Sequence, residues 1–284
     1  MIICFGEVLM DCLPDKNVIG GAPFNVAINL KRLGNDVQFI SQVGSDDFGR
    51  EIYALAQQEK IEKSITINKH YKTGFVTVEF VDNEPNYTIH KNTAWHFIPQ
   101  TIIEGDVDYF VFGSLATYFE PNKKVFERYH NELTNATFVC DLNLRAPFFS
   151  DDHILFCLEH CDVLKVNENE WSKLLSLQEC LTDEDLFQVL FQDYKIDKVI
   201  LTKGSDGAIL IDEKESVKVP VSVIPQGKFQ DAIGAGDGFL SSFLDTFIKT
   251  KNGKIALQKA STYASLICQN QGAVLSNELF EQHK

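Results

Sequence analysis

Short apolar runs alternate with longer amphipathic stretches along most of the chain. The first of these predict strands at Ile2–Phe5 and Val37–Ile40, and helices at Phe24–Leu33 and Phe48–Gln58. This alternation is typical of a parallel sheet covered by helices. Ligands of such sheets bind beyond the carboxyl ends of the strands, so functional residues are expected just after the apolar runs. The alternation resumes after Val107, with further strands predicted at Tyr109–Phe112, Thr137–Asp141, Val163–Val166 and Lys198–Leu201.

One region, residues 75–91, follows a different pattern. Phe75–Val81 alternates with period two, Asp82–Asn86 is rich in turn residues, and Tyr87–Lys91 is again extended. We therefore expect an antiparallel hairpin. A hairpin that projects from an α/β core buries little surface by itself, so it should cover either the active site or the matching hairpin of a second subunit. An ordinary edge ribbon is the alternative.

Composition narrows the class of partner. The chain has 284 residues, 44% of them hydrophobic, which suits one domain spanning residues 1–284. Its 26 Lys and Arg against 40 Asp and Glu give a net charge of −14, which argues against nucleic acid as a partner. No apolar stretch approaches the roughly 18 residues that a membrane span needs. The first residues do not resemble a signal peptide, and seven scattered cysteines suit a reducing compartment, so a cytoplasmic protein is expected.

A glycine-rich loop that opens an apolar helix, Asp231–Leu244, is the most informative segment. Glycines at 234, 236 and 238 let backbone N–H groups converge on one space, where the helix dipole also favours negative charge. Asp237 within this loop can accept a proton from an attacking hydroxyl while the amides stabilise a transferred phosphoryl group. The alternative is a close-packed turn with Asp237 as a helix N-cap. Neither a P-loop nor a Rossmann motif is present, since Phe239 occupies the third glycine position of the latter.

A second loop near the N-terminus also precedes a predicted helix. It reads Gly20-Gly21-Ala-Pro-Phe-Asn25, in which the glycines permit close approach of a ligand and Asn25 can both donate and accept hydrogen bonds. Asp11 follows the first strand, where its carboxylate could accept two hydrogen bonds from a vicinal diol. Paired hydroxyls indicate a sugar. The alternatives are a solvated loop position for Asp11 and a capping role for Asn25.

Together, the two loops resemble the signature regions of the ribokinase-like, or PfkB, family of carbohydrate kinases. These are an N-terminal Gly-Gly-x-x-x-Asn and a C-terminal Asp-x-x-Gly-Ala-Gly-Asp, here roughly 210 residues apart. The chain looks most like bacterial fructokinases. The resemblance implies a doubly wound, mainly parallel sheet flanked by helices, with a small β-sheet lid from about residues 12–19 and 72–97. Further matching segments are Gln42–Gly49, Asp141–Arg145, Asn167–Glu170, Thr202–Ala208 and Gln271–Ala273.

The resemblance also implies roles for individual residues. Asp237 would be the catalytic base, and Arg145 would face the sugar or the transferring phosphoryl group. Trp95 offers a flat ring that could stack on a sugar. The expected anion hole consists of the amides of Gly234, Ala235 and Gly236. The residues expected to hold the sugar are Asp11, Gly20, Gly21 and Asn25.

For the nucleotide, the resemblance implies that Asn167 and Glu170 organise Mg²⁺, its waters and the phosphates of ATP. A monovalent cation such as K⁺ would lie near Asp231, Ile233 and Ser276. Relatives can pair through their lids, so a homodimer is expected. The residues expected to line the nucleotide cleft are Thr202, Lys203, Gly204 and Gly207, with Gly234 and Gly236.

The predicted reaction transfers the γ-phosphate of MgATP to a hydroxymethyl group of a small sugar, with fructose favoured. Three departures from the family pattern leave the substrate open: Ala260-Ser261-Thr262 lacks a frequent adenine-side asparagine, Lys91–Trp95 lacks an expected basic residue, and Ala22 replaces an asparagine common in ribokinases. Ribose, 2-keto-3-deoxygluconate and nucleosides are alternative substrates, and a silent sugar-binding regulator is an alternative function. A metal site at His153, Cys157, His160 and Cys161 is a further alternative. The apolar neighbours of these residues favour buried cysteines with surface histidines instead.

Overall fold

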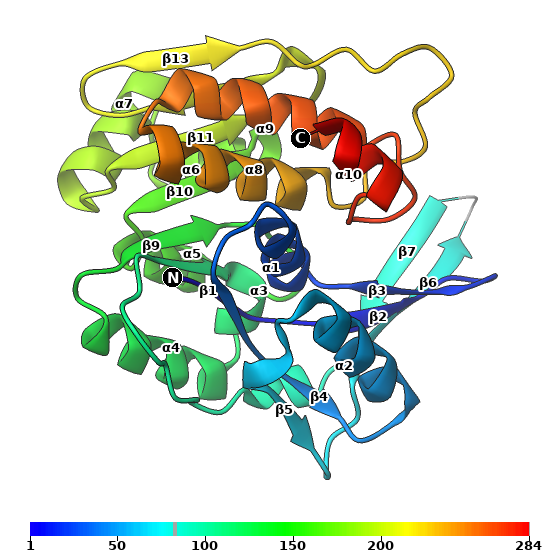
Figure 1. Cartoon of the computed structure of the whole chain (residues 1–284). Coiled ribbons are helices and arrows are strands. Elements are labelled where there is room, and N and C mark those ends of the chain that lie inside the picture. The colour runs from blue at the N-terminus through cyan, green and yellow to red at the C-terminus, as the bar shows by residue number, and fades with distance from the viewer. Residues whose placement is uncertain (82–83, 284) are drawn as a thin grey trace.

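A nine-stranded sheet forms the centre of the structure, a computed structural model that describes residues 1–81 and 84–283 (Figure 1). The strand order is β13-β12-β11-β10-β9-β8-β1-β4-β5. The strands from β11 to β5 pair in parallel, whereas β12 and β13 add an antiparallel edge. The bounds are β1 Ile2–Phe5, β4 Val37–Gly44, β5 Ile65–Asn68, β8 Tyr109–Gly113, β9 Thr137–Asp141, β10 Val163–Asn167, β11 Lys198–Thr202, β12 Ala208–Ile211 and β13 Ser216–Val219.

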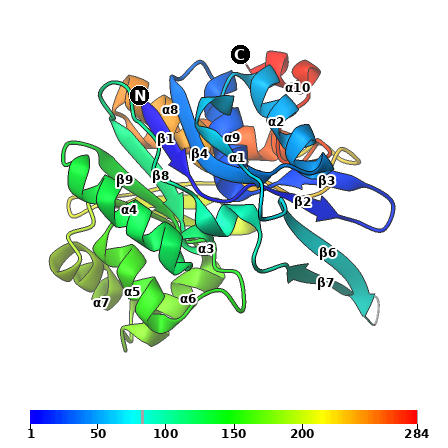
Figure 2. The ribbon, with the colours of Figure 1, turned by 90° about the horizontal axis from the view of Figure 1, so that it is seen from below.

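Helices cover both faces of this sheet (Figures 1 and 2). Successive strand residues point to opposite faces, so Ile2 and Cys4 join one core cluster while Ile3 and Phe5 join the other. The predicted doubly wound fold is confirmed. The first face packs against α1 (Ala22–Arg32), α2 (Asp47–Glu59), α8 (Ala235–Thr250) and α9 (Gly253–Ile267). The second packs against α4 (Glu120–Glu132), α5 (Asp151–Glu159), α6 (Glu168–Leu177) and α7 (Asp183–Gln188).

The remaining helical elements are short. They are α3 (Ser114–Thr117), α10 (Asn277–His283) and the turns η1 (Glu62–Ser64), η2 (Ala94–Phe97), η3 (Val189–Asp193) and η4 (Gly204–Asp206). No helix in the described part of the chain is long and apolar enough to span a membrane.

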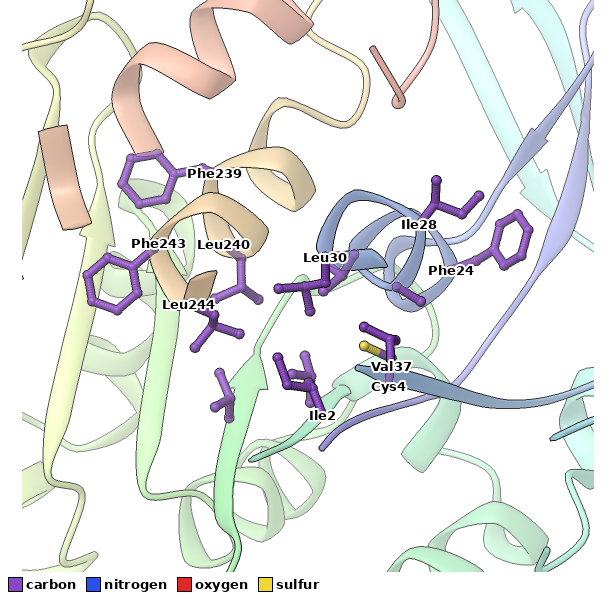
Figure 3. Close-up of a cluster of buried hydrophobic side chains, with 14 of the residues drawn as sticks. Ile2, Cys4, Phe24, Ile28, Leu30, Val37, Phe239, Leu240, Phe243 and Leu244 are labelled. Atoms are coloured by element: carbon purple, nitrogen blue, oxygen red, sulfur yellow. The ribbon is translucent and has the colours of Figure 1, made fainter. Parts of the chain in front are cut away.

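Helices α1 and α8 pack against each other although they lie at opposite ends of the chain. Leu30 of α1 points toward Leu240 and Leu244 of α8, above Ile2 of the first strand (Figure 3). Burying a leucine side chain contributes about 1.5–3 kcal/mol, so this contact holds the two helices firmly together. Their N-terminal loops, the two candidate motifs, are thereby brought to the same place.

A separate four-stranded sheet projects from one side of the core (Figures 1 and 2). Its order is β3 (Asn17–Gly20), β2 (Leu9–Cys12), β6 (Gly74–Val81) and β7 (Glu84–Ile89). The antiparallel pairing of β6 with β7 confirms the predicted hairpin. Strand β7 begins at Glu84, within the predicted turn Asp82–Asn86, and includes Pro85, which an edge strand tolerates. Two residues of the predicted turn, Asp82 and Asn83, lie outside the described residues.

Most predicted elements of the core agree with the structure within a few residues, and β9 matches its predicted bounds. The largest difference is β4, which continues to Gly44 beyond the predicted end at Ile40. The polar residues that follow Ile40 are buried and bonded. Ser41 Oγ, for example, donates to the Gly6 carbonyl at 2.7 Å. Satisfied polar groups can continue a buried strand.

Candidate active site

The two glycine loops meet at a hydrogen bond between side chains. Asn25 Nδ2, on α1, donates to Asp237 Oδ2, on α8, at 2.8 Å. Helix α1 begins just after Gly21 with Pro23 in its first turn, and α8 begins just after Gly234, so each side chain lies in the first turns of its helix. The residues that the sequence placed in two separate motifs therefore form one site.

Neither residue is a helix cap, so the capping alternatives are wrong. The N-cap of α8 is Gly234, which has a left-handed φ of 73°, and Asp237 lies inside the helix. A Cβ atom at Gly234 would collide with Ala273, so the turn needs glycine for space as well as conformation. Asn25 lies inside α1 and is buried. Both side chains are therefore free to serve the site between the helices.

The environment of Asp237 suits a general base. Burial, and then the nearby Asp141 charge, raise the pKa of Asp237 to about 6, while the Asn25 hydrogen bond and the charges of Lys165 and Arg145 oppose the rise. A carboxylate with this pKa is mostly ionised at neutral pH and accepts a proton more readily than an ordinary aspartate.

A buried ion pair that the sequence analysis did not identify forms one wall of the site. Lys165 Nζ lies 2.8 Å from Asp141 Oδ2 and 2.9 Å from Oδ1, on neighbouring strands β10 and β9 where the two residues are in register. Burial, the largest single cause, lowers the pKa of Lys165, but the charge and hydrogen bond of Asp141, together with the charges of Asp237 and Glu170, raise the pKa overall. Nζ lies 3.0 Å from where a Cβ of Gly236 would be, so a lysine charge adjoins the predicted anion cradle. In the sequence, the signal that could have identified this pair is a lysine within the apolar run Val163–Asn167.

Among the predicted sugar-side residues, Asp11 lies within electrostatic range of Arg145. Asp11 lies in β2, and Gly20 of the neighbouring strand β3, which pairs with Leu9, leaves room for the Asp11 carboxylate, which a Cβ there would strike. Burial raises the pKa of Asp11 to about 6, and the Arg145 charge opposes the rise. Gly21 has a φ of 115°, and a Cβ on it would lie 2.5 Å from the Glu7 carbonyl oxygen. The exposed Arg145 acts electrostatically on Glu7, Asp11 and Asp237 together.

Two predicted nucleotide residues lie side by side, because Asn167 of β10 pairs with Thr202 of β11. Asn167 and Glu170 also form a capping box at the start of α6, in which each side chain accepts from the other residue's backbone N–H. The second Glu170 oxygen accepts from the Leu144 N–H at 3.0 Å. Carboxylate oxygens keep spare lone pairs, so Glu170 still fits contact with a metal through water. No group of three or more His, Cys, Asp or Glu in residues 1–81 and 84–283 could hold a metal ion.

The other predicted nucleotide residues follow β11. Lys203 Nζ lies 3.8 Å from Glu168 Oε1, and Gly204 adopts a φ of 48°. Gly207 has a φ of 91°, and a Cβ on it would collide with the Val219 carbonyl oxygen. The turn into β12 therefore requires glycine at 207 whether or not a nucleotide binds there.

The loop before α8 contains several internal bonds. The Ala235 N–H, one of the three predicted for the anion hole, donates to the Ala232 carbonyl at 3.2 Å in this structure. In the predicted cation site, Asp231 Oδ1 accepts from the Ile233 N–H at 2.9 Å, and Ser276 Oγ accepts from the Leu279 N–H at 3.4 Å. Monovalent cation binding there stays a prediction.

Trp95 is buried, whereas stacking on a sugar requires an exposed ring face. Its side chain is 0% exposed and stacks on His96 with ring centroids 3.9 Å apart. A Cβ on Gly74 of β6 would collide with the indole, so Trp95 packs beneath the small sheet. It therefore has no exposed ring face for a sugar in this structure. Its role here is to support that sheet, together with Leu115, Ala116 and Phe148.

His153 and Cys157 lie on α5, and His160 and Cys161 follow its end. The expected surface position is wrong for His153, which is buried. His153 Nε2 bonds the Ser114 carbonyl at 2.9 Å, and His160 Nδ1 bonds the Phe156 carbonyl at 2.8 Å. Cys157 and Cys161 are buried and free. These contacts account for the four residues without a metal.

Comparison with known proteins supports the same reading. A family model described as pfkB family carbohydrate kinase matches residues 2–279. Fructokinase from Escherichia coli is 28% identical over 263 residues, which cover 84% of this chain and 81% of that protein.

Solved structures share the fold along the whole chain. A fructokinase from Xylella fastidiosa with bound ATP superposes with a TM-score of 0.86 at 22% identity, covering 99% of this chain and 97% of the other. A fructokinase from Vibrio cholerae O395 with bound fructose, ADP and calcium ion superposes with a TM-score of 0.84 at 21% identity, covering 100% and 98%. With the expected ATP-dependent carbohydrate kinase class confirmed by the family match, we conclude that the chain belongs to the PfkB family of carbohydrate kinases.

Proposed function

We propose that the chain transfers the γ-phosphate of MgATP to a hydroxymethyl oxygen of a small sugar, with fructose as the substrate. The observation that carries the proposal is the Asn25–Asp237 hydrogen bond, which joins the sugar-side loop to the base at the start of α8. The relatives named fructokinase, one of them solved with fructose and ADP, support the choice of sugar.

In this mechanism, Asp237 removes the proton of the attacking sugar hydroxyl. The hydroxyl oxygen bonds to the γ-phosphorus in line with the departing ADP. The amides of Gly234, Ala235 and Gly236, with the adjoining Lys165 charge, stabilise the transferring group. Glu170, beside Asn167, would hold Mg²⁺ through water, and the ion would supply positive charge to the phosphates. The cleft for the nucleotide is proposed at Thr202, Lys203, Gly204 and Gly207.

Several further features stand as proposals on the same basis. The chain forms one domain over residues 1–284, and residues 12–19 and 72–97 act as a lid that excludes water from the site. Exposed edges of the small sheet can pair with those of a second copy, which gives a homodimer. A monovalent cation binds near Asp231, Ile233 and Ser276. All seven cysteines are free, which suits the cytoplasm.

Replacing Asp11 by alanine tests the sugar pocket. Losing hydrogen bonds to a charged carboxylate costs about 1.5–3 kcal/mol each, so the KM for the sugar should rise roughly 10- to 100-fold. The KM for ATP should change little, since Asp11 lies on the small sheet. Steady-state kinetics with each substrate varied in turn measure both values. Unaltered sugar KM would show that the pocket is misplaced.

The raised pKa values predict an acidic limit of activity. Asp237 must be ionised to accept a proton. Its ionised fraction stays high until the pH approaches its pKa of about 6. We therefore expect kcat/KM to fall as the pH is lowered through about 6, rather than near 4 as for an ordinary aspartate. Asp11, with a pKa also of about 6, should steepen the decline. A profile that stays flat down to pH 5 would contradict this.

The substrate is tested by an ADP-release assay with MgATP and a panel of fructose, ribose, 2-keto-3-deoxygluconate, tagatose and adenosine, with and without potassium. Turnover with fructose supports the full proposal. Turnover with another sugar keeps the mechanism and replaces the substrate. Sugar binding without turnover on any member of the panel would favour a silent regulator instead.

A further inference from the structure

A small cavity adjoins the candidate active site through Ala22 and Asp141, with a volume of about 10 Å³ open to a water molecule. Two buried polar atoms in its lining residues lack a hydrogen-bond partner, Glu7 Oε2 and Ser114 Oγ. Glu7 is 3% exposed and Ser114 is 0% exposed. The other residues that line the cavity are Ala22, Pro23, Val26, Val111, Phe112, Gly113, Leu115, Asp141 and Asn143.

Unsatisfied polar atoms in a cavity of this size point to an ordered water. Leaving a buried donor or acceptor unpaired costs about 1–3 kcal/mol, and a buried water typically makes about three hydrogen bonds to such groups. Asp141 and Asn143, at the end of β9, add polar groups to the same wall. The cavity therefore has both the room and the partners for one water molecule.

We propose that one buried water joins Glu7 to Ser114 in this cavity, and that Glu7 thereby acts as a positioning residue for Asp237. The inference rests on the proposed function, in which Asp237 is the base. Glu7 follows β1, and its carboxyl lies close to the N–H of Ala22, the first residue of α1. Three residues later, Asn25 donates to Asp237. The water ties this helix start to Ser114, at the carboxyl end of β8.

The protonated form of Glu7 is the one that fits this role. Burial, and to a smaller extent the Asp237 charge, raise the pKa of Glu7 to about 8, opposed by the N–H groups of Glu7 and Ala22 and by Arg145. A neutral carboxyl donates its proton to the water. Ionised Glu7 would place a second negative charge beside Asp237 and the incoming phosphates. The charged groups that face it are Asp237 of α8, Arg145 after β9 and, across the cavity, Asp141 of β9 with its partner Lys165.

The decisive experiment is the pH dependence of kcat at saturating fructose and MgATP, or at the active sugar of the panel, for the wild type and Glu7→Gln. Wild-type kcat should decline as the pH rises through about 8, because Glu7 then ionises. Glutamine donates through its amide but cannot ionise, so in Glu7→Gln this decline should move up by at least about one pH unit. An unmoved alkaline decline would overturn the proposal. Glu62→Gln is the matched control, since Glu62 Oε2 is also buried without a partner but lies in η1, and its profile should match the wild type.

Ser114→Ala tests the water separately. Removing one partner of the water should lower kcat about threefold to tenfold, as expected for one lost hydrogen bond, with the KM for the sugar unchanged. A wild-type kcat in Ser114→Ala, or a crystal structure with an empty cavity at a resolution that shows ordered waters, would overturn the proposal. Thermal unfolding checks that both variants fold. Asp237→Asn separates this inference from the proposed function, because it should lose turnover at every pH, whereas the Glu7 variant should change only the alkaline side.

Discussion

Replacing Asp237 by asparagine is expected to lower kcat by about 100- to 10,000-fold, the usual loss when a general base is removed. Asparagine has the same shape, and its oxygen can still accept the hydrogen bond from Asn25, so the packing of α1 against α8 should persist. What disappears is the ability to take the proton of the attacking hydroxyl. The measurement is kcat by ADP release at saturating substrates, with circular dichroism to confirm the fold.

Asp245→Asn provides a matched control on the same helix. Asp245 is buried and, like Asp237, accepts a hydrogen bond from an asparagine side chain, here Asn35 at 2.8 Å. Its partners are Asn35 and Lys249, neither of which belongs to the glycine loop before α8. This variant should keep wild-type turnover. If Asp237→Asn retained more than about a tenth of the wild-type kcat, Asp237 would not be the base.

The second large effect is expected from Lys165→Met. The substitution preserves volume but leaves the Asp141 carboxylate buried without its ion partner, and breaking a buried pair in this way costs about 3–5 kcal/mol. The Lys165 charge also interacts electrostatically with Asp237 and Glu170, so its removal should lower turnover as well. The free energy of unfolding in urea measures the first effect, and kcat the second.

The double variant Lys165→Met with Asp141→Leu separates the two consequences. With both charges gone, the unfolding free energy should recover most of what Lys165→Met lost, since apolar replacement of a buried pair is often neutral. Activity should stay low, because the cation beside the anion cradle is still missing. Recovery of activity together with stability would show that Lys165 has only a structural role.

An exposed ion pair on α4 provides a control for the effect of burial on stability. Lys124 and Glu120 are paired on α4 with side chains 65% and 67% exposed, whereas those of Lys165 and Asp141 are 9% and 7% exposed. Lys124→Met should change the unfolding free energy by at most about 0.5 kcal/mol. If Lys165→Met cost no more than this surface variant, the pair would not be stabilised in the way its burial implies.

Local patterns in the sequence were sufficient for much of the fold and for the chemistry of the key loop. The strand at Thr137–Asp141 and the hairpin of β6 and β7 follow from hydrophobic periodicity, which depends only on neighbouring residues. The turn before α8 needs glycine at 234 for reasons of backbone conformation, and that too is a local property. Asp237 could be singled out because it stands inside this loop.

Tertiary structure decided which residues meet. Asn25 and Asp237 are 212 positions apart, and only the packing of α1 on α8 makes them partners. The register of β9 with β10 places Lys165 opposite Asp141, and the same fold brings Glu7 and Ser114 to the lining of one cavity. Trp95, assigned to the sugar from its ring alone, is buried beneath the small sheet. Periodicity specifies which face a side chain takes, whereas strand order and helix packing determine what lies on the other side. The proposed base could therefore be singled out from the sequence, but its electrostatic surroundings could not.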